Sequence, residues 1–255
     1  MRTVVIIGLG QLGRIFSGGL LRRSCQIVPA NRHDDLLQIA ADYPKPECVL
    51  VAVAEADLHP VLSALPASWR DRVALIQNEL LPRDWLAHGI AQPSVASVWF
   101  EKKKGTDAKP LIATPVYGPH AALLVEALQS IDIPAHVITR EDELLYELVR
   151  KNVYILTANI AGILSGGNVS DLWQLHRALA TEVAQEIMDI QDWLTGARND
   201  RERLLGGMLE AFDADPLHAC RGRSAPDRLQ RNLGFADQAG LAVPKLREIA
   251  AAAFA

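Results

Sequence analysis

Three glycines near the N-terminus have the spacing of a phosphate-binding turn. Gly8, Gly10 and Gly13 follow directly on an apolar, β-branched run at residues 3–7. With this spacing the first glycine permits a tight turn, the second lets the backbone approach a pyrophosphate, and the third packs a helix against its strand. The start of that helix offers free N–H groups and a positive dipole to phosphate. The predicted dinucleotide-binding turn comprises Gly8, Leu9, Gly10, Gln11, Leu12 and Gly13; the alternative is a glycine turn with a structural role alone.

Two residues after the second predicted strand could select the dinucleotide. Asn31 and Arg32 follow the apolar run at residues 26–30. NAD-binding proteins of this kind have an acidic residue here for the ribose hydroxyls, whereas an arginine accommodates the 2′-phosphate of NADP. Asp34 and Asp35 argue for NAD, but they come later and are typical of caps for the next helix. We therefore expect NADP(H) as the cofactor, bound by Asn31 and Arg32.

A lysine in the second half of the chain could act as a proton donor. Lys151, Ile155 and Asn159 are spaced four and four, so they lie along one side of a predicted helix. The neighbouring residues are apolar, so this side should be mostly buried. A buried lysine is costly unless a cleft uses it. The alternative is a lysine that lays its stem along an amphipathic helix and keeps its ammonium group in water.

A polar pair follows the fourth predicted strand, at residues 72–76. Gln77 and Asn78 would reach the carboxyl edge of the sheet, where ligands bind in open α/β folds. The amide of Asn78 could hold the nicotinamide ribose or an oxo acid. The alternative is an Asx turn into a helix at residues 82–88.

The elements that must position these residues alternate between strand and helix as far as residue 138. We expect strands at residues 3–7, 26–30, 48–54, 72–76, 94–100, 109–114 and 135–138. From residue 140 the apolar residues recur with helical periodicity, with one helix expected over 172–194. The sequence thus predicts an α/β Rossmann-type domain with a mostly parallel sheet at 1–139, followed by an all-α substrate or dimerisation domain at 140–255.

Charge and composition argue against several other classes of protein. The 255 residues carry a formal net charge of −4, which gives no sign of a nucleic-acid or membrane surface. No apolar run reaches the ~20 residues of a membrane span. The three cysteines are far apart, which fits neither a disulfide framework nor a zinc motif. We expect a soluble, cytoplasmic protein with a small-molecule substrate and no metal, in which the apolar helices could form a homodimer.

Taken together, the sequence resembles the ketopantoate reductase family, as a divergent member of this branch of the 6-phosphogluconate-dehydrogenase-like two-domain reductases. The resemblance covers most of the chain. It rests on the order and spacing of the Gly8 to Gly13 turn, Asn31-Arg32, Gln77-Asn78, Lys151 with Asn159, the turn at 168–172 and the segment 240–244. It implies a two-domain oxidoreductase that uses NADPH to reduce a small 2-oxo acid to the 2-hydroxy acid, as in pantothenate biosynthesis.

The resemblance also implies roles for individual residues. Lys151 matches the family's lysine, which donates a proton to the ketone as hydride arrives at the carbon. Asn159 would hold Lys151 or the substrate hydroxyl. Asn78 would position Lys151 or the nicotinamide ribose.

The chain departs from the family pattern at several positions. Ile155 stands where the motif has its first asparagine, Ala54 where a lysine is frequent, and Glu79 where a glycine is usual. The family's glutamate in the C-terminal domain has no clear counterpart. These departures favour a substrate other than ketopantoate. They keep two alternatives open: an opine-type or 3-hydroxy-acid dehydrogenase on the same plan, and an NADP(H)-binding protein without catalysis.

Overall fold

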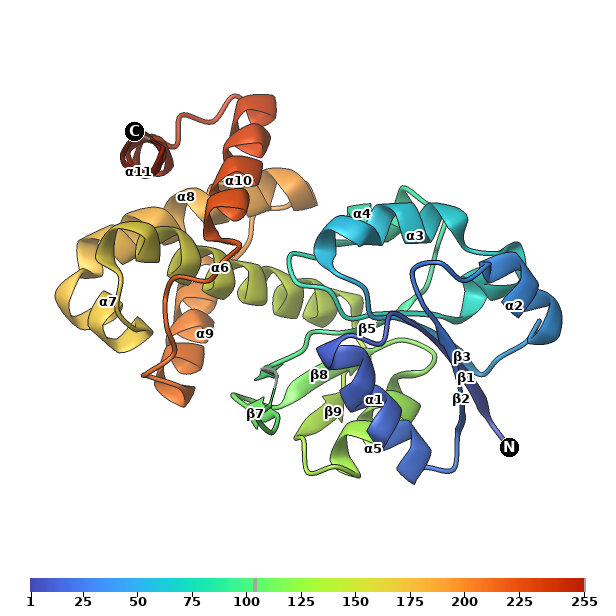
Figure 1. Ribbon diagram of the computed structural model, residues 1–255. Helices are drawn as coiled ribbons and strands as arrows, with labels where there is room; N and C mark the ends of the chain where they lie inside the picture. The colour runs from blue at the N-terminus through green and yellow to red at the C-terminus, as the bar shows by residue number, and fades with distance from the viewer. Residues whose placement is uncertain (103–104, 255) are drawn as a thin grey trace. The chain divides into compact units, whose positions relative to one another are not determined.

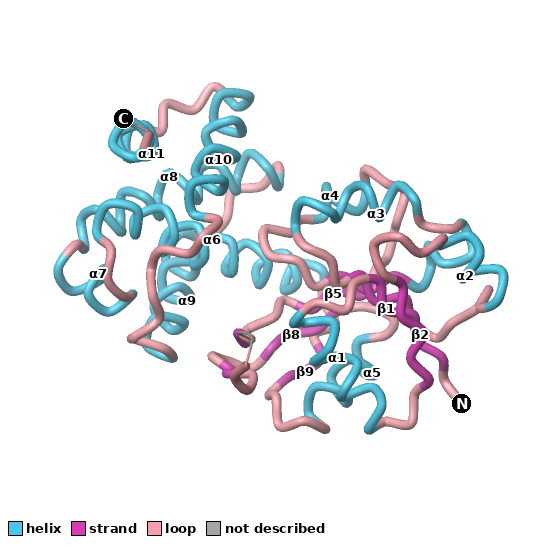
Figure 2. The backbone as a smooth tube through the Cα atoms, in the orientation of Figure 1, coloured by secondary structure: helices cyan, strands magenta, loops and turns pink. Residues whose placement is uncertain are grey.

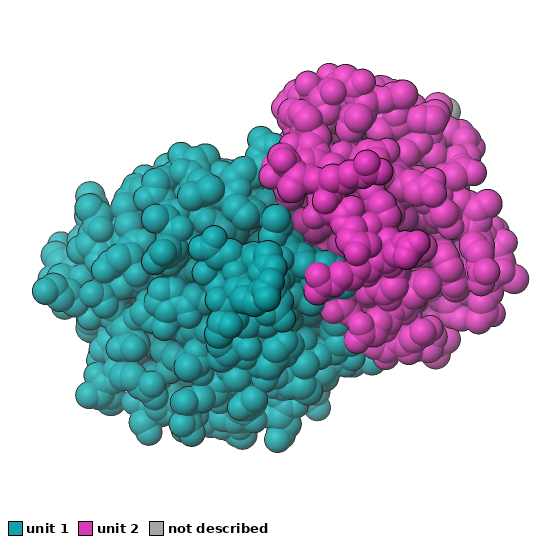
Figure 3. All heavy atoms as spheres, turned by 180° about the vertical axis from the view of Figure 1, so that it is seen from behind, with its two compact units in different colours: residues 1–148 teal, residues 149–255 magenta. Residues whose placement is uncertain are grey.

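The computed structural model separates into two compact units, Met1–Leu148 and Val149–Ala255 (Figure 3). The structure describes residues 1–102 and 105–254. The sequence placed a boundary after residue 139, just before helix α6 (Glu141–Ser165), whereas the compact units divide within this helix. Each unit is described by itself below.

The first unit is built on a seven-stranded sheet with the order β2-β1-β3-β4-β5-β8-β9. Its strands are β1 (Thr3–Ile7), β2 (Gln26–Ala30), β3 (Cys48–Val51), β4 (Val73–Leu75), β5 (Ser94–Ala96), β8 (Thr114–Tyr117) and β9 (Ala135–Val137). All neighbouring strands pair in parallel except β5 and β8. The chain runs outward from β1 to β2 and returns to the other side of β1 with β3. That change of direction is a topological switch point, and ligands of open α/β sheets bind at such points.

Helices cover both faces of this sheet (Figure 1). One face carries α1 (Gln11–Arg22) and α5 (Ala121–Gln129); the other carries α2 (Leu36–Asp42), α3 (Leu58–Ala64) and α4 (Pro82–Leu86). Two short 3₁₀ helices, η1 (Glu55–Asp57) and η2 (Ala67–Arg72), flank α3. The predicted Rossmann-type α/β architecture with a mostly parallel sheet is confirmed.

Burial explains why the apolar runs become strands. All four residues of β3 are buried, as expected for a parallel strand covered on both faces. Val4 and Ile6 of β1 share a core with Phe16 and Leu20 of α1. Burying a side chain of this size contributes about 1.5–3 kcal/mol. This core fixes α1, and with it the glycine turn at its start.

Two predicted strands of this unit differ from the structure. The strand expected at 94–100 is divided into β5 and the short β6 (Phe100–Glu101), and the strand expected at 109–114 into β7 (Lys109–Pro110) and β8 (Thr114–Tyr117). The hairpin expected between the two segments is present as the antiparallel pair of β6 and β7. Pro115 in β8 argues against a strand in the sequence, because proline cannot donate to a sheet. In the structure its carbonyl accepts from the backbone N–H of Ser97 at 3.1 Å, so the proline is accommodated.

Figure 2 shows the second unit as helices joined by loops. Its described residues also include one isolated β-bridge, between Asn168 and Ala219. The helices are the remainder of α6, α7 (Val169–Leu175), α8 (Arg177–Thr195), α9 (Arg201–Ala214), α10 (Ala225–Ala239) and α11 (Pro244–Ala253). The all-α prediction is confirmed. The single helix expected over 172–194 is wrong, because His176 leaves helical geometry at φ −126° and ψ 35° and separates α7 from α8.

Within the described part of the chain, no helix combines the length and the apolar character that crossing a bilayer would require.

Candidate functional site

A pocket of about 780 Å³ lies in the first unit at the carboxyl ends of β1, β2 and β3. Its walls come from the glycine turn, the segment that joins β2 to α2, and the segment from the end of β3 into α3. This is the switch point of the sheet, and the volume lies in the range of small-molecule and cofactor sites. The fold therefore places a ligand-sized cavity where the sequence predicts dinucleotide binding.

The glycine turn has the geometry that its spacing predicts. Gly8 adopts a φ of +96°, which L-residues with a side chain rarely adopt. A Cβ on Gly13 would lie 2.1 Å from the carbonyl oxygen of Gly8, so only glycine allows α1 to start this close to β1. At Gly10, which precedes α1, a Cβ would meet no described atom within 4 Å. Gly10 therefore borders open space inside the pocket, where a phosphate could approach the start of the helix.

The structure brings only part of the predicted cofactor residues to the pocket wall. The residues of that set that line it are Gly8, Gly10, Asn31 and Arg32. Leu9, Gln11, Leu12 and Gly13 continue the turn into α1 without contributing to the wall. Asn78 lies in the turn between β4 and α4, also outside the wall.

The acidic residues after β2 have separate structural roles. Asp35 caps α2, because its carboxylate accepts the backbone N–H groups of Leu37 at 2.8 Å and Gln38 at 3.4 Å. The cap predicted from the sequence is thus confirmed for Asp35. Asp34 instead accepts from the backbone N–H of Asn31 at 2.7 Å and from its side-chain amide at 3.2 Å. Asp34 therefore holds Asn31 at the end of β2.

Arg32 makes an ion pair that the sequence did not indicate. Its Nη2 lies 2.7 Å from Oδ2 of Asp57, a residue of η1 that follows β3. The two side chains are 74% and 42% exposed, so the pair lies at the surface of the pocket. The partners are 25 residues apart and follow different strands, and no sequence pattern joins them.

Gln77 ties the end of β4 to the pocket wall. Its side-chain amide donates to the carbonyl oxygens of Val51 at 2.8 Å and Val53 at 3.3 Å, and its Oε1 accepts the N–H of Ile76 at 3.1 Å. The buried side chain thus fixes the backbone that leaves β3. Glu79, two residues later, has a φ of +59°, a left-handed conformation that favours glycine.

The predicted catalytic helix of the second unit is continuous from Lys151 to Asn159, so the expected side of the helix is formed. Lys151 is half-buried and Asn159 is buried. The Asn159 side-chain amide donates to the carbonyl oxygen of Cys220 at 3.1 Å, and its Oδ1 accepts from Nη1 of Arg228 at 2.7 Å. Arg228 is a buried cation on α10 that sequence analysis missed, because it lies 69 residues away.

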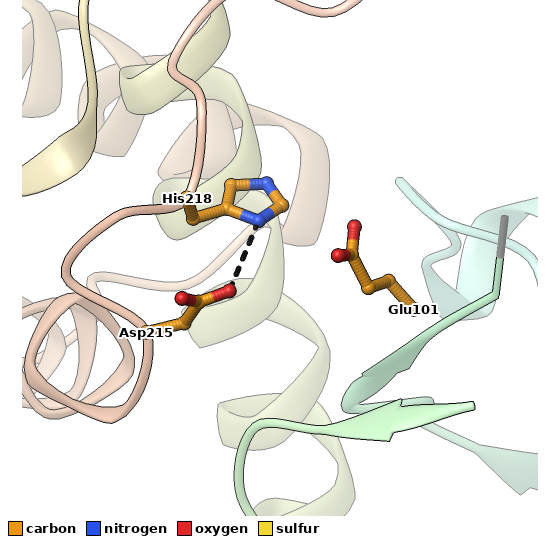
Figure 4. Close-up of side chains that lie close together, drawn as sticks. All are labelled: Glu101, Asp215 and His218. Carbon is orange, nitrogen blue, oxygen red and sulfur yellow. Dashed lines mark ion pairs between the residues drawn. The ribbon is translucent and has the colours of Figure 1, made fainter. Parts of the chain in front are cut away.

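The loop after α9 is anchored to the turn between α6 and α7. The backbone N–H of Val169 donates to the carbonyl of His218 at 2.9 Å, and that of Cys220 donates to Gly167 at 3.1 Å. The Asp215 carboxylate lies 3.6 Å from Nδ1 of His218 (Figure 4). Burial raises the pKa of the Cys220 thiol to about 11, so this cysteine is a thiol near neutral pH.

No family model matches the sequence. No curated protein shows significant sequence similarity to it. The fold is similar to that of a PanE/ApbA family ketopantoate reductase from Ralstonia eutropha, with a TM-score of 0.70, 14% identity, and coverage of 99% of this chain and 97% of that chain.

Two further solved structures extend the comparison. A D-mandelate dehydrogenase in complex with NADH has a TM-score of 0.69 and 14% identity, covering 98% of this chain and 96% of that chain. A probable 2-dehydropantoate 2-reductase from Bacillus subtilis has a TM-score of 0.69 and 17% identity, covering 98% of both chains. The resemblance to ketopantoate reductases predicted from the sequence is therefore confirmed at the level of the fold.

Proposed function

We propose that the protein is an oxidoreductase that uses NADPH to reduce a small 2-oxo acid to the 2-hydroxy acid. The observation that carries the proposal is the pocket at the switch point of the sheet, bounded by the glycine turn and by Asn31 and Arg32. The solved structures of similar fold support it, since mandelate and pantoate are both 2-hydroxy acids. Fold alone does not define activity, so the proposal rests on this site.

The described residues of the pocket fit a phosphorylated dinucleotide. The open space beside Gly10 leaves room for a pyrophosphate at the start of α1. The guanidinium of Arg32, which is exposed and pairs with Asp57 through Nη2, is the cation in the described wall that could bind the 2′-phosphate. For these reasons we propose NADPH as the cofactor, although the D-mandelate dehydrogenase of similar fold was solved with NADH.

In the proposed reaction NADPH, when bound, supplies a hydride to the ketone carbon. Lys151 hydrogen-bonds the ketone oxygen and gives it a proton as the negative charge develops there. This role requires the ammonium group within about 3 Å of that oxygen. Asn78 would hold the nicotinamide ribose. Asn159, whose side chain contacts Arg228 and the carbonyl oxygen of Cys220, would hold Lys151 or the substrate hydroxyl.

A panel of branched and linear 2-oxo acids tests the proposal. The purified protein should oxidise NADPH with at least one acid of the panel, and should oxidise NADH more slowly with the same acid. If NADPH raises the melting temperature but no acid supports its oxidation, the protein binds the dinucleotide without catalysis. If neither NADPH nor NADH changes the melting temperature, the proposed function is wrong.

A further inference from the structure

The Arg32–Asp57 ion pair occupies the group that the 2′-phosphate of NADPH would need. Both side chains line the pocket, and Nη2 of Arg32 lies 2.7 Å from Oδ2 of Asp57. Arg32 is the one cationic residue among the described residues of the pocket wall. A 2′-phosphate that binds this guanidinium must therefore share it with a carboxylate or displace that carboxylate.

Asp57 stands at a position where aspartate ordinarily caps a helix. It directly precedes α3, yet among the described residues its carboxylate accepts no N–H of that helix. Its backbone has helical dihedrals, φ −92° and ψ −5°, whereas a capping residue is ordinarily extended. The third residue of α3 is Pro60, which has no N–H for a cap to bind. The carboxylate binds Arg32 instead.

The other carboxylates of the pocket have different partners. Asp34 accepts from Asn31, and Asp35 accepts from the N–H groups at the start of α2. The donors to these two carboxylates are uncharged backbone N–H groups and the side-chain amide of Asn31. Of the three aspartates in the described wall, Asp57 is the one that pairs with the cation that NADPH would use.

We propose that Asp57 competes with the 2′-phosphate for Arg32 and so sets how strongly the pocket prefers NADPH over NADH. The inference rests on the proposed function, and adds to it that Asp57 lowers the preference for NADPH over NADH. NADH has a single hydroxyl where NADPH has the dianionic 2′-phosphate, so its binding does not require the pair to break. Asp57 therefore lowers the affinity for NADPH selectively, both by occupying Arg32 and by repelling the phosphate.

The expected size of the effect follows from the exposure of the pair. Ion pairs open to solvent are weak and screened by salt. The substitution Asp57→Asn should therefore lower the dissociation constant for NADPH by about two- to fivefold at low salt. The constant for NADH should change by less than about twofold. Calorimetric titration of the full-length protein with each dinucleotide measures both.

The matched control is Asp35→Asn. This substitution also removes one negative charge from the pocket wall, and asparagine retains the cap of α2. Because Asp35 does not contact Arg32 in the described hydrogen bonds, its removal should improve NADPH binding less than Asp57→Asn does. If the two substitutions increased the affinity for NADPH equally, the increase would come from the loss of any negative charge in the pocket wall. That result would overturn the inference.

The substitution Arg32→Gln completes a double-mutant cycle. In this background Asp57→Asn should give less than half of its gain in NADPH affinity on a logarithmic scale, because there is no guanidinium left to release. A full gain in this background would overturn the inference, as would weaker NADPH binding by Asp57→Asn alone, which would mean that Asp57 positions Arg32 for the phosphate.

The same titrations separate this inference from the proposed function. If the wild-type protein prefers NADPH and Asp57→Asn leaves that preference unchanged, the role of Asp57 is wrong while the proposed function stands. If the wild-type protein binds neither dinucleotide, both fall.

Discussion

Lys151 is the residue on which the proposed chemistry depends. A general acid in this position typically accelerates a reaction by about 10²–10⁴-fold. Lys151→Ala should therefore lower kcat for 2-oxo acid reduction by at least about 100-fold, while the dissociation constant for NADPH stays within about twofold of the wild-type value. Steady-state kinetics and calorimetric titration check the two parts separately.

Lys245→Ala provides a matched control in the same unit. The Lys245 ammonium pairs with Glu182 at 3.0 Å and with Glu248, contacts that have no place in the proposed reaction. This variant should retain the wild-type kcat. Activity that survives in Lys151→Ala would remove the lysine from the mechanism.

Single residues were predictable from sequence where local backbone geometry decides the residue type. The conformation of Gly8 and the close approach at Gly13 follow from the turn itself. The Arg32–Asp57 and Asn159–Arg228 contacts could not be predicted, because the partners are 25 and 69 residues apart and the sequence does not give side-chain direction. The same limit left the surroundings of Asn159 unknown.

At the level of elements, the contact of α1 with α5 gives a prediction about two adjacent glycines. A Cβ on Gly19 would lie 2.1 Å from the carbonyl oxygen of Ala127 in α5, whereas a Cβ on Gly18 would meet no described atom within 4 Å. Gly19→Ala should lower the free energy of unfolding by about 1–3 kcal/mol through overpacking. Gly18→Ala should raise it by about 0.5–1 kcal/mol, since alanine is the better helix former.

Urea unfolding of both variants measures these changes, with the slope of the transition as a check that unfolding remains two-state. Similar effects of the two substitutions would contradict the close packing of α1 on α5. Moreover, Gly19→Ala should weaken NADPH binding, because α1 carries the glycine turn.

Helices and strands were predictable where a local pattern of apolar residues is enough to define them. The run that forms β3 is apolar throughout, and β1 and β2 occupy the predicted residues. Two exceptions are β8 and the break between α7 and α8. Pro115 makes the residues of β8 unlike a strand in sequence. A single non-helical residue, His176, divides α7 from α8, although their apolar pattern is continuous. A strand that contains a proline and a helix break of one residue both depend on tertiary contacts, which the local sequence does not specify.

For the whole molecule, the pattern of strands and helices persists where the sequence does not. Structures of similar fold cover nearly the whole chain at 14–17% identity. Buried apolar positions can exchange residues of similar volume without loss of the fold, whereas ligand selection depends on a few side chains. The fold was therefore predictable from sequence, while the substrate, the cofactor preference and the expected homodimer remain predictions.

The most direct test of the central claim is transfer of hydrogen from cofactor to substrate. The protein is incubated with NADPH that carries deuterium at the transferable position of nicotinamide C4 and with the panel of 2-oxo acids, and the products are analysed by mass spectrometry. The account predicts a 2-hydroxy acid with deuterium on the carbon next to the carboxylate from the wild-type protein, and at most a trace from Lys151→Ala. Bound NADPH with no deuterated product from any acid would contradict it.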